Sequence, residues 1–317
     1  MAGPLTALAA RLYGSGWELR RRAYARGWLV PERVAARVVS IGNLTTGGTG
    51  KTTLTLHLAM RARAHGIATA VVVRDYHAGP DGVGDEHRLY DAALGSAAVF
   101  GGHVKRRAAH VAAAAGHRLL LVDDGFSHWR LARDLDLVLL DYEDPWGGDA
   151  LLPAGRLREP RRALQRAGIV VLSRVPAGRD PASRIEEIRR VAPAAGFAAG
   201  RHRVTGAAAL DGGPFAPGGR VRVVTATGHP RAVAASAAEH GFQVTALSAY
   251  RDHHWFTAAE AAAESTRAAR DGARVLLTAK DAIRWPARDP EVGVLEVAWE
   301  WVTGGDTVER AVFGERA

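Results

Sequence analysis

The chain carries one run of residues with the composition of a phosphate-binding loop. Closely spaced glycines let consecutive backbone N–H groups converge on phosphate oxygens, and the start of a following helix adds positive potential. The Lys51 ammonium would reach the outer phosphates of a nucleoside triphosphate, and the Thr52 hydroxyl would bind Mg²⁺. Thr45 replaces the first glycine of the usual pattern, for which Gly47 and Gly48 can compensate. The predicted nucleotide-binding residues are Thr45, Thr46, Gly47, Gly48, Thr49, Gly50, Lys51 and Thr52.

Two adjacent carboxylates follow the apolar run 119–122. In a parallel sheet, ligands gather at the carboxyl ends of the strands. In nucleotide-binding proteins with a phosphate loop, a second acid for magnesium stands at such a strand end. The sequence therefore predicts a metal site formed by Thr52, Asp123 and Asp124, with Asp124 also a catalytic candidate. Without the phosphate loop upstream, Asp-Asp-Gly would equally fit a solvated turn.

The elements around these residues alternate between strand and helix patterns. Short apolar runs typical of buried strands occur at 38–41, 68–73, 119–122, 137–140 and 169–172, with helical patterns at 51–65 and 103–115. A second series has strands at 221–225, 244–247, 275–278 and 292–297, with helices at 230–240 and 258–270. This alternation predicts an α/β fold with a parallel sheet covered by helices on both faces, like that of P-loop NTPases.

Composition shifts divide the chain into three expected regions. Residues 195–219 are rich in Gly, Ala and Pro, which places a domain junction there. We expect an N-terminal amphipathic region over 1–36, a P-loop domain over 37–203 and a smaller α/β domain over 204–317.

The N-terminal region has the pattern of a basic amphipathic helix. Apolar residues recur at helical spacing, and only Glu18 and Glu32 are acidic. The apolar positions are Leu5, Leu8, Leu12, Leu19 and Ala23, and the arginines up to position 37 are Arg11, Arg20, Arg21, Arg22, Arg26, Arg33 and Arg37. Such a helix can lie on an anionic bilayer, where each basic residue is worth about 1 kcal/mol. The alternative is a helix packed on its own domain.

The overall composition sets further limits. The formal net charge is +9, which favours an anionic partner, although a high-GC genome would also enrich arginine. The absence of cysteine excludes disulfides, thiolate catalysis and cysteine-bound metals. Neither a signal peptide nor a run of roughly 18 apolar residues that could span a membrane is visible, so we expect a cytoplasmic protein.

Several motifs together resemble the tetraacyldisaccharide 4′-kinase family, the lipid A 4′-kinases of Gram-negative bacteria. They occur in family order from about residue 5 to 285, and the run of residues 151–160 is the most specific. The motifs are Gly42–Thr52, Gly84-Asp85-Glu86, Asp123–His128, Arg133–Asp136, Leu151–Pro160, Asp252-His253-His254 and Thr278-Ala279-Lys280-Asp281.

The resemblance implies transfer of the ATP γ-phosphate to the 4′-hydroxyl of a tetraacyldisaccharide 1-phosphate, with Mg²⁺. It also implies two α/β domains that form the substrate cleft and an N-terminal helix at the cytoplasmic face of the inner membrane. We expect a peripheral, monomeric protein whose partners are the lipid substrate and the anionic membrane surface, not nucleic acid.

The family's functional residues fall on named positions of this chain. Its phosphate-loop residues correspond to Lys51 and Thr52, and its magnesium-associated acids to Asp123 and Asp124. Its base for the sugar hydroxyl corresponds to Asp85, followed by Glu86 and paired with either His253 or His254. A supporting Arg-Glu pair corresponds to Arg158 and Glu159, which could instead pair only with each other.

Two departures and two rival functions stay open. Ser127 and Ala279 stand where the family usually has Gln and Glu, beside the expected site. A GTPase switch or metallochaperone-type protein would need an Asn/Thr-Lys-x-Asp element, and the lysine of residues 278–281 comes one position too late for it. A membrane-associated nucleotide-binding homologue without turnover is the other alternative.

Overall fold

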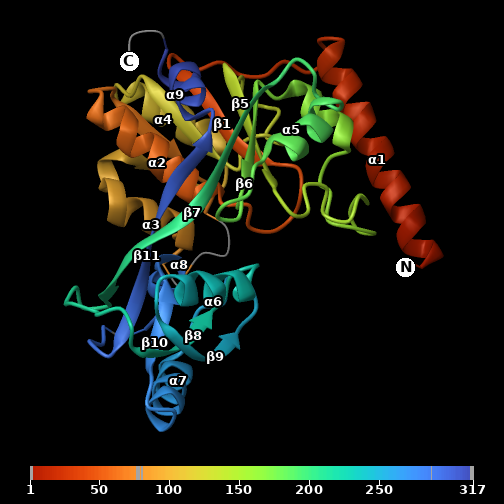
Figure 1. Ribbon diagram of the computed structural model, residues 1–317. Helices are drawn as coiled ribbons and strands as arrows, with labels where there is room; N and C mark the ends of the chain where they lie inside the picture. The colour runs from red at the N-terminus through yellow and green to blue at the C-terminus, as the bar shows by residue number, and fades with distance from the viewer. Residues whose placement is uncertain (1–2, 76–78, 80, 287, 315–317) are drawn as a thin grey trace. The chain divides into compact units, whose positions relative to one another are not determined.

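The computed structural model describes residues 3–75, 79, 81–286 and 288–314. The chain forms two compact units. The first contains the described residues of Met1–Arg74, Leu94–Arg201 and Trp299–Ala317, and the second contains those of Asp75–Ala93 and His202–Ala298. Strands β7 (Gly196–Ala209) and β11 (Val292–Thr303) each run from one unit into the other (Figure 1).

The first unit is built on a parallel sheet with the strand order β3-β2-β4-β1-β5-β6-β7. Its strands are β1 (Arg37–Asn43), β2 (Thr69–Val72), β3 (Val99–Phe100), β4 (Leu119–Asp123), β5 (Leu135–Asp141), β6 (Ile169–Ser173) and β7. Strands β2, β4 and β6 are buried along their whole length, as expected for a parallel sheet covered on both faces. The expected α/β sheet is therefore confirmed.

Helices flank this sheet. They are α1 (Pro4–Ala25), α2 (Lys51–Ala64), α4 (Lys105–Ala114), α5 (Ala182–Arg189) and α9 (Gly305–Phe313), with short 3₁₀ turns η1 (Ser96–Ala98) and η2 (Arg161–Arg166). The patterns expected over 51–65 and 103–115 appear as α2 and α4. One apolar core contains Val138, Leu140, Val170 and Leu172 from the strands. A second core contains Val38, Val72, Leu120 and Val122, packed with alanines of α4.

The second unit has a smaller parallel arrangement, with the strand order β11-β10-β8-β9. Its other strands are β8 (Arg220–Thr225), β9 (Gln243–Ala249) and β10 (Arg274–Thr278). Its helices are α6 (Pro230–Glu239), α7 (Ala258–Arg270) and α8 (Ala279–Ile283), and most of α3 (Asp85–Leu94) also belongs here. Helix α7 begins with a capping box, in which Thr257 and Glu260 satisfy each other's backbone N–H groups.

The two units differ from the expected domain boundaries in three segments. The described residues of 75–93 lie in the second unit, where Asp85 and Arg88 form their contacts. Residues 299–314 lie in the first unit, where Glu309 of α9 pairs with Arg61 of α2 at 2.9 Å. Residues 3–36 belong to the first unit, on which α1 packs.

Helix α1 has a packed side and an exposed side. Trp17 is buried and meets the Trp129 ring edge-on, with 6.1 Å between ring centroids. Leu5, Leu8, Leu12 and Leu19 are all exposed, Leu5 to 82%. Among the described helices, none is long and apolar enough to cross a membrane. The helix therefore both packs on its own unit and presents an apolar stripe.

Candidate active site

The predicted phosphate loop connects β1 to α2. Gly47 and Gly50 have φ values of 102° and 85°, which side-chain-bearing residues rarely adopt, and Gly50 caps α2. The Thr49 hydroxyl is buried and has no hydrogen-bond partner among the described residues. A loop of this kind suits phosphate oxygens, which can accept from its backbone N–H groups and from such a hydroxyl.

The run 151–160, the most specific part of the family resemblance, holds this loop from one side. The Thr46 amide donates to the Arg156 carbonyl at 2.7 Å, and the Arg158 amide donates to the Leu44 carbonyl at 2.7 Å. The main chain of residues 156–158 therefore holds the start of the phosphate loop in place.

Asp124 lies beside the phosphate loop and faces two cations. The Arg158 guanidinium donates to both of its carboxylate oxygens at 2.7 Å, and Lys51 Nζ lies 3.7 Å from Oδ1. Desolvation alone would raise the pKa of Asp124, but Lys51 and Arg158 hold the pKa of this carboxyl far below its usual range. Asp124 is therefore ionised at neutral pH and can accompany a magnesium–phosphate group.

Lys105, which the sequence analysis did not single out, supports the same acidic turn. Its buried ammonium donates to the main-chain carbonyls of Asp123 and of Asp124, the second at 2.8 Å. The Asp124 backbone has a φ of 49°, so this turn adopts an uncommon left-handed conformation. No local pattern marks Lys105, because it reaches the turn from the start of α4.

Glu159 does not pair with Arg158. It is buried and binds Arg166 at 2.8 Å, and the Trp129 indole N–H donates to it at 3.4 Å. The Arg166 guanidinium lies over the Phe126 and Trp129 rings. The alternative that residues 158 and 159 merely neutralise each other is therefore wrong.

Arg174, also missed by the sequence analysis, contacts the phosphate loop from the end of β6. Its guanidinium donates to the Gly48 carbonyl and, at 2.6 Å, to the Asp141 carboxylate. Since Asp141 ends β5, this arginine ties the loop to the carboxyl edge of the sheet.

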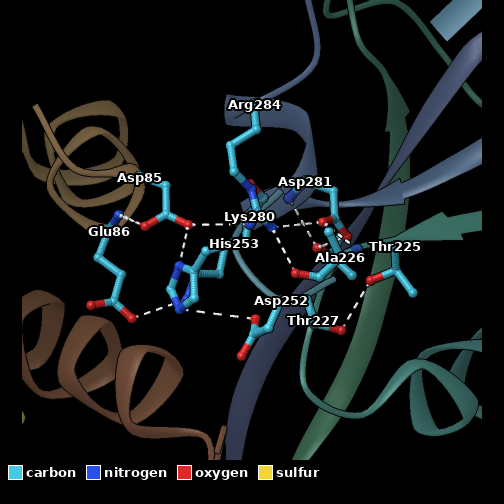
Figure 2. Close-up of polar contacts among 11 residues, drawn as sticks. Asp85, Glu86, Thr225, Ala226, Thr227, Asp252, His253, Lys280, Asp281 and Arg284 are labelled. Atoms are coloured by element: carbon cyan, nitrogen blue, oxygen red, sulfur yellow. Dashed lines mark hydrogen bonds and ion pairs between the residues drawn. The ribbon is translucent and has the colours of Figure 1, made fainter. Parts of the chain in front are cut away.

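In the second unit, Asp85 and His253 form a directly bonded pair (Figure 2). Asp85 is the first residue of α3 and is only 2% exposed, and its Oδ2 lies 2.9 Å from His253 Nδ1. His254 points elsewhere: its Nε2 binds Glu260 at 3.0 Å and its ring stacks on Tyr250. The histidine that contacts Asp85 is therefore His253.

Cations surround the Asp85 carboxylate. The Arg284 Nη1 lies 3.5 Å from Asp85 Oδ2, and Lys280 donates to Glu86 at 3.0 Å. Burial raises the pKa of Asp85, but the His253 hydrogen bond and the charges of Lys280 and Arg284 outweigh it and lower this pKa below its usual value. Asp85 is therefore a carboxylate at neutral pH.

The predicted residues thus fall into two local sets. Lys51, Thr52, Asp123, Asp124 and Arg158 belong to the first unit, and Asp85, Glu86 and His253 belong to the second. Among the described residues, no three His, Asp or Glu side chains cluster so that they could hold a metal ion by themselves. Mg²⁺ commonly binds one or two carboxylates together with substrate phosphates, so the acids beside the phosphate loop fit that requirement.

Comparisons with known proteins agree on one family. The family described as "Tetraacyldisaccharide-1-P 4'-kinase" matches residues 3–312 of the chain. A tetraacyldisaccharide 4'-kinase from Anaeromyxobacter sp. (strain Fw109-5) is 37% identical, covering 96% of this chain and 89% of the relative. Another, from Geobacter sulfurreducens, is 33% identical, covering 90% of this chain and 85% of the relative.

A solved structure supports the fold. The chain is similar to LpxK from Aquifex aeolicus, whose crystal structure is described as a complex with ATP, with a TM-score of 0.70 and 21% sequence identity. The similarity covers 96% of each chain. From the family match and the relatives, this chain belongs to the tetraacyldisaccharide-1-P 4'-kinase family, as its motifs predicted.

Proposed function

We propose that this chain transfers the γ-phosphate of ATP to the 4′-hydroxyl of a tetraacylated glucosamine disaccharide 1-phosphate, a step of lipid A biosynthesis. The observation that carries the proposal is the glycine-rich turn between β1 and α2, with Lys51 beside the ionised Asp124, in a member of this family. The 4′-oxygen forms a bond to the γ-phosphorus, the bond to the bridging oxygen of ADP breaks, and the hydroxyl proton passes to a base.

The first unit would bind the triphosphate. Backbone N–H groups of residues 45–52 and the Lys51 ammonium would hold its phosphates, while Arg174 keeps the loop in shape. Mg²⁺ bound by Thr52, Asp123 and Asp124 would offset negative charge on the phosphate oxygens. The Arg158 guanidinium, already bonded to Asp124, would add positive charge near the transferring group.

The second unit would supply the base. The Asp85 carboxylate can only accept a hydrogen bond, so His253 Nδ1 must carry the proton of their 2.9 Å contact. That tautomer leaves His253 Nε2 as the nitrogen that accepts a proton from the sugar hydroxyl, with Asp85 fixing the ring and stabilising the imidazolium. A positioned base of this kind contributes roughly 10²–10⁴ in rate. The proposed reaction requires both units to act on one substrate.

Helix α1 would place the protein on the surface that holds its lipid substrate. The exposed leucines recur at intervals of three, four and seven, so they share one side of the helix, away from the buried Trp17. Arg11 and Arg22 are exposed on the same helix and can attract anionic lipid headgroups. We propose reversible binding of a monomer to the cytoplasmic face of the inner membrane, since a basic amphipathic helix binds without spanning.

A transfer assay tests this function. ATP labelled in its γ-phosphate is incubated with purified disaccharide 1-phosphate and wild-type protein, Lys51→Ala or Arg107→Ala. Arg107 is an exposed cation of the first unit with no side-chain hydrogen bond or ion pair in the part of the chain that the structure describes, which makes it a matched control. We expect a labelled bisphosphorylated lipid from wild type and Arg107→Ala, and none from Lys51→Ala. GTP hydrolysis without a lipid product would contradict the proposal.

A further inference from the structure

Helix α1 is bonded directly to the residue that clamps Asp124. The Tyr13 hydroxyl donates to the Arg158 main-chain carbonyl at 2.7 Å. The Arg158 amide donates to Leu44, and its guanidinium donates to both oxygens of Asp124. Residue 158 is therefore held by its N–H group, its carbonyl and its side chain, and α1 supplies the tie at the carbonyl.

The same side of α1 contacts other residues of the first unit, within 151–162. A Cβ added at Gly14 would lie 3.0 Å from Leu151 Cδ1, which shows how closely the helix approaches the run 151–160. Glu18 binds Arg162 at 2.9 Å, and the Arg162 guanidinium lies over the Trp17 ring. The packed side of α1 therefore contacts residues 151–162, while the leucine stripe on the other side remains exposed.

We infer that Tyr13 is a positioning residue through which binding of α1 to a lipid surface orders the Arg158–Asp124 clamp and raises turnover. The inference rests on the proposed function and names a regulation of its site. A single helix in water gains little from its own hydrogen bonds, so helix formation depends on what packs against it. Lipid on the leucine stripe favours the helical state of α1, and only that state presents the Tyr13 hydroxyl to Arg158. The two contacts use different sides of the helix, so they can form together and stabilise each other.

The expected size follows from one hydrogen bond. A neutral hydrogen bond changes an equilibrium by about two- to tenfold in net terms. If the clamp is correctly placed only while Tyr13 holds the carbonyl, removing the hydroxyl lowers kcat by a factor in that range. ATP contacts the phosphate loop in the proposal, whereas the Tyr13 hydroxyl donates to residue 158 outside that loop, so the KM for ATP should change little.

The experiment compares wild type, Tyr13→Phe and Tyr24→Phe, with the disaccharide substrate in neutral detergent micelles, with and without phosphatidylglycerol vesicles. Tyr24 is a matched control: it lies on the same helix and packs on Trp129, and its hydroxyl makes no hydrogen bond within the described residues. We expect vesicles to raise kcat of wild type and Tyr24→Phe. Tyr13→Phe should bind the vesicles equally well, keep its KM for ATP, and show about two- to tenfold lower kcat without stimulation.

Each other outcome overturns the inference. Equal stimulation of Tyr13→Phe and wild type, no stimulation of wild type, or a Tyr13→Phe defect in vesicle binding would each do so. A Leu8→Ser variant, in which the hydroxyl contact is intact, should show the reverse pattern of weaker vesicle binding and normal kcat in micelles. A wild-type protein that makes no phosphorylated lipid at all would mean that the proposed function has failed, which the transfer assay reveals separately.

Discussion

Arg284 is a buried cation that faces two carboxylates of the second unit, those of Asp281 and Asp85. Removing its charge should lower the stability of that unit. The Arg284 guanidinium is fully buried and donates to the Asp281 carboxylate at 2.7 Å and to the Ala226 carbonyl at 3.2 Å. It also lies 3.5 Å from the carboxylate of Asp85. An Arg284→Met substitution keeps most of the apolar stem and removes the charge from both acids.

The decrease in stability depends on which hydrogen bonds the two carboxylates keep after the substitution. Breaking a buried ion pair by deleting one partner costs about 3–5 kcal/mol. Asp281 keeps the Ala226 amide at 2.9 Å and the Thr278 hydroxyl at 2.7 Å, and Asp85 keeps its His253 hydrogen bond. These remaining donors limit the damage, so we expect a decrease near the lower end, about 3 kcal/mol in the free energy of opening the second unit.

Hydrogen exchange of the β8 and β10 amides, followed by mass spectrometry, measures that free energy locally. Arg251→Met is the matched control, because Arg251 is an exposed arginine of the same unit without a side-chain hydrogen bond or ion pair among the residues described. The control should change protection by less than about 0.5 kcal/mol. A different result is that the free energy of opening falls by less than about 1 kcal/mol for Arg284→Met, or by the same amount as for the control. Either result would refute the claim that Arg284 stabilises the two buried carboxylates.

Further expected outcomes concern the phosphate loop, the acidic turn and α1. Gly42→Ala should destabilise the first unit by about 1–3 kcal/mol in urea unfolding, since the added Cβ would lie 2.5 Å from Phe126 Cβ and 2.8 Å from its backbone nitrogen; an unchanged midpoint would contradict this. Burial, together with the charges of Lys105 and Arg133, lowers the pKa of His128 from 6.5 to about 4, so the unfolded chain binds this proton more readily. The contribution of His128 to stability is therefore present above pH 6.5 and lost as pH falls toward 4, and His128→Gln should flatten the stability profile over that window. Leu5→Ser combined with Leu8→Ser should weaken sedimentation with phosphatidylglycerol vesicles by roughly tenfold or more, whereas Met60→Ser, at an exposed apolar position on α2, should not.

The placement of residues 45–50 between a strand and a helix could be predicted because the signal is local. The glycines and the lysine, and the strand and helix on either side, lie within one short stretch of sequence. The Asp123–Asp124 turn was predictable for the same reason, since an apolar strand leads directly into it. The alternation of apolar runs likewise sufficed for the α/β sheet.

The remaining features depend on contacts between distant residues. Asp85 and His253 are 168 positions apart, so only the family resemblance could associate them. The sequence could not show which of His253 and His254 contacts Asp85, because the answer depends on the backbone conformation. His253 has a φ of 61° and its side chain lies toward α3, whereas His254 binds Glu260. Lys105 and Arg174 reach the Asp124 and Gly48 carbonyls from another helix and another strand. The described residues of 75–93 and residues 299–314 join units that are not their sequence neighbours.

The central claim is that His253, fixed by Asp85, takes the proton of the sugar hydroxyl. It is tested most directly by the kcat for lipid phosphorylation of His253→Gln beside that of His254→Gln. We predict a decrease of roughly 10²–10⁴ for His253→Gln and a change of only a few-fold for His254→Gln. Equal effects of the two substitutions, or a larger one for His254→Gln, would contradict the account.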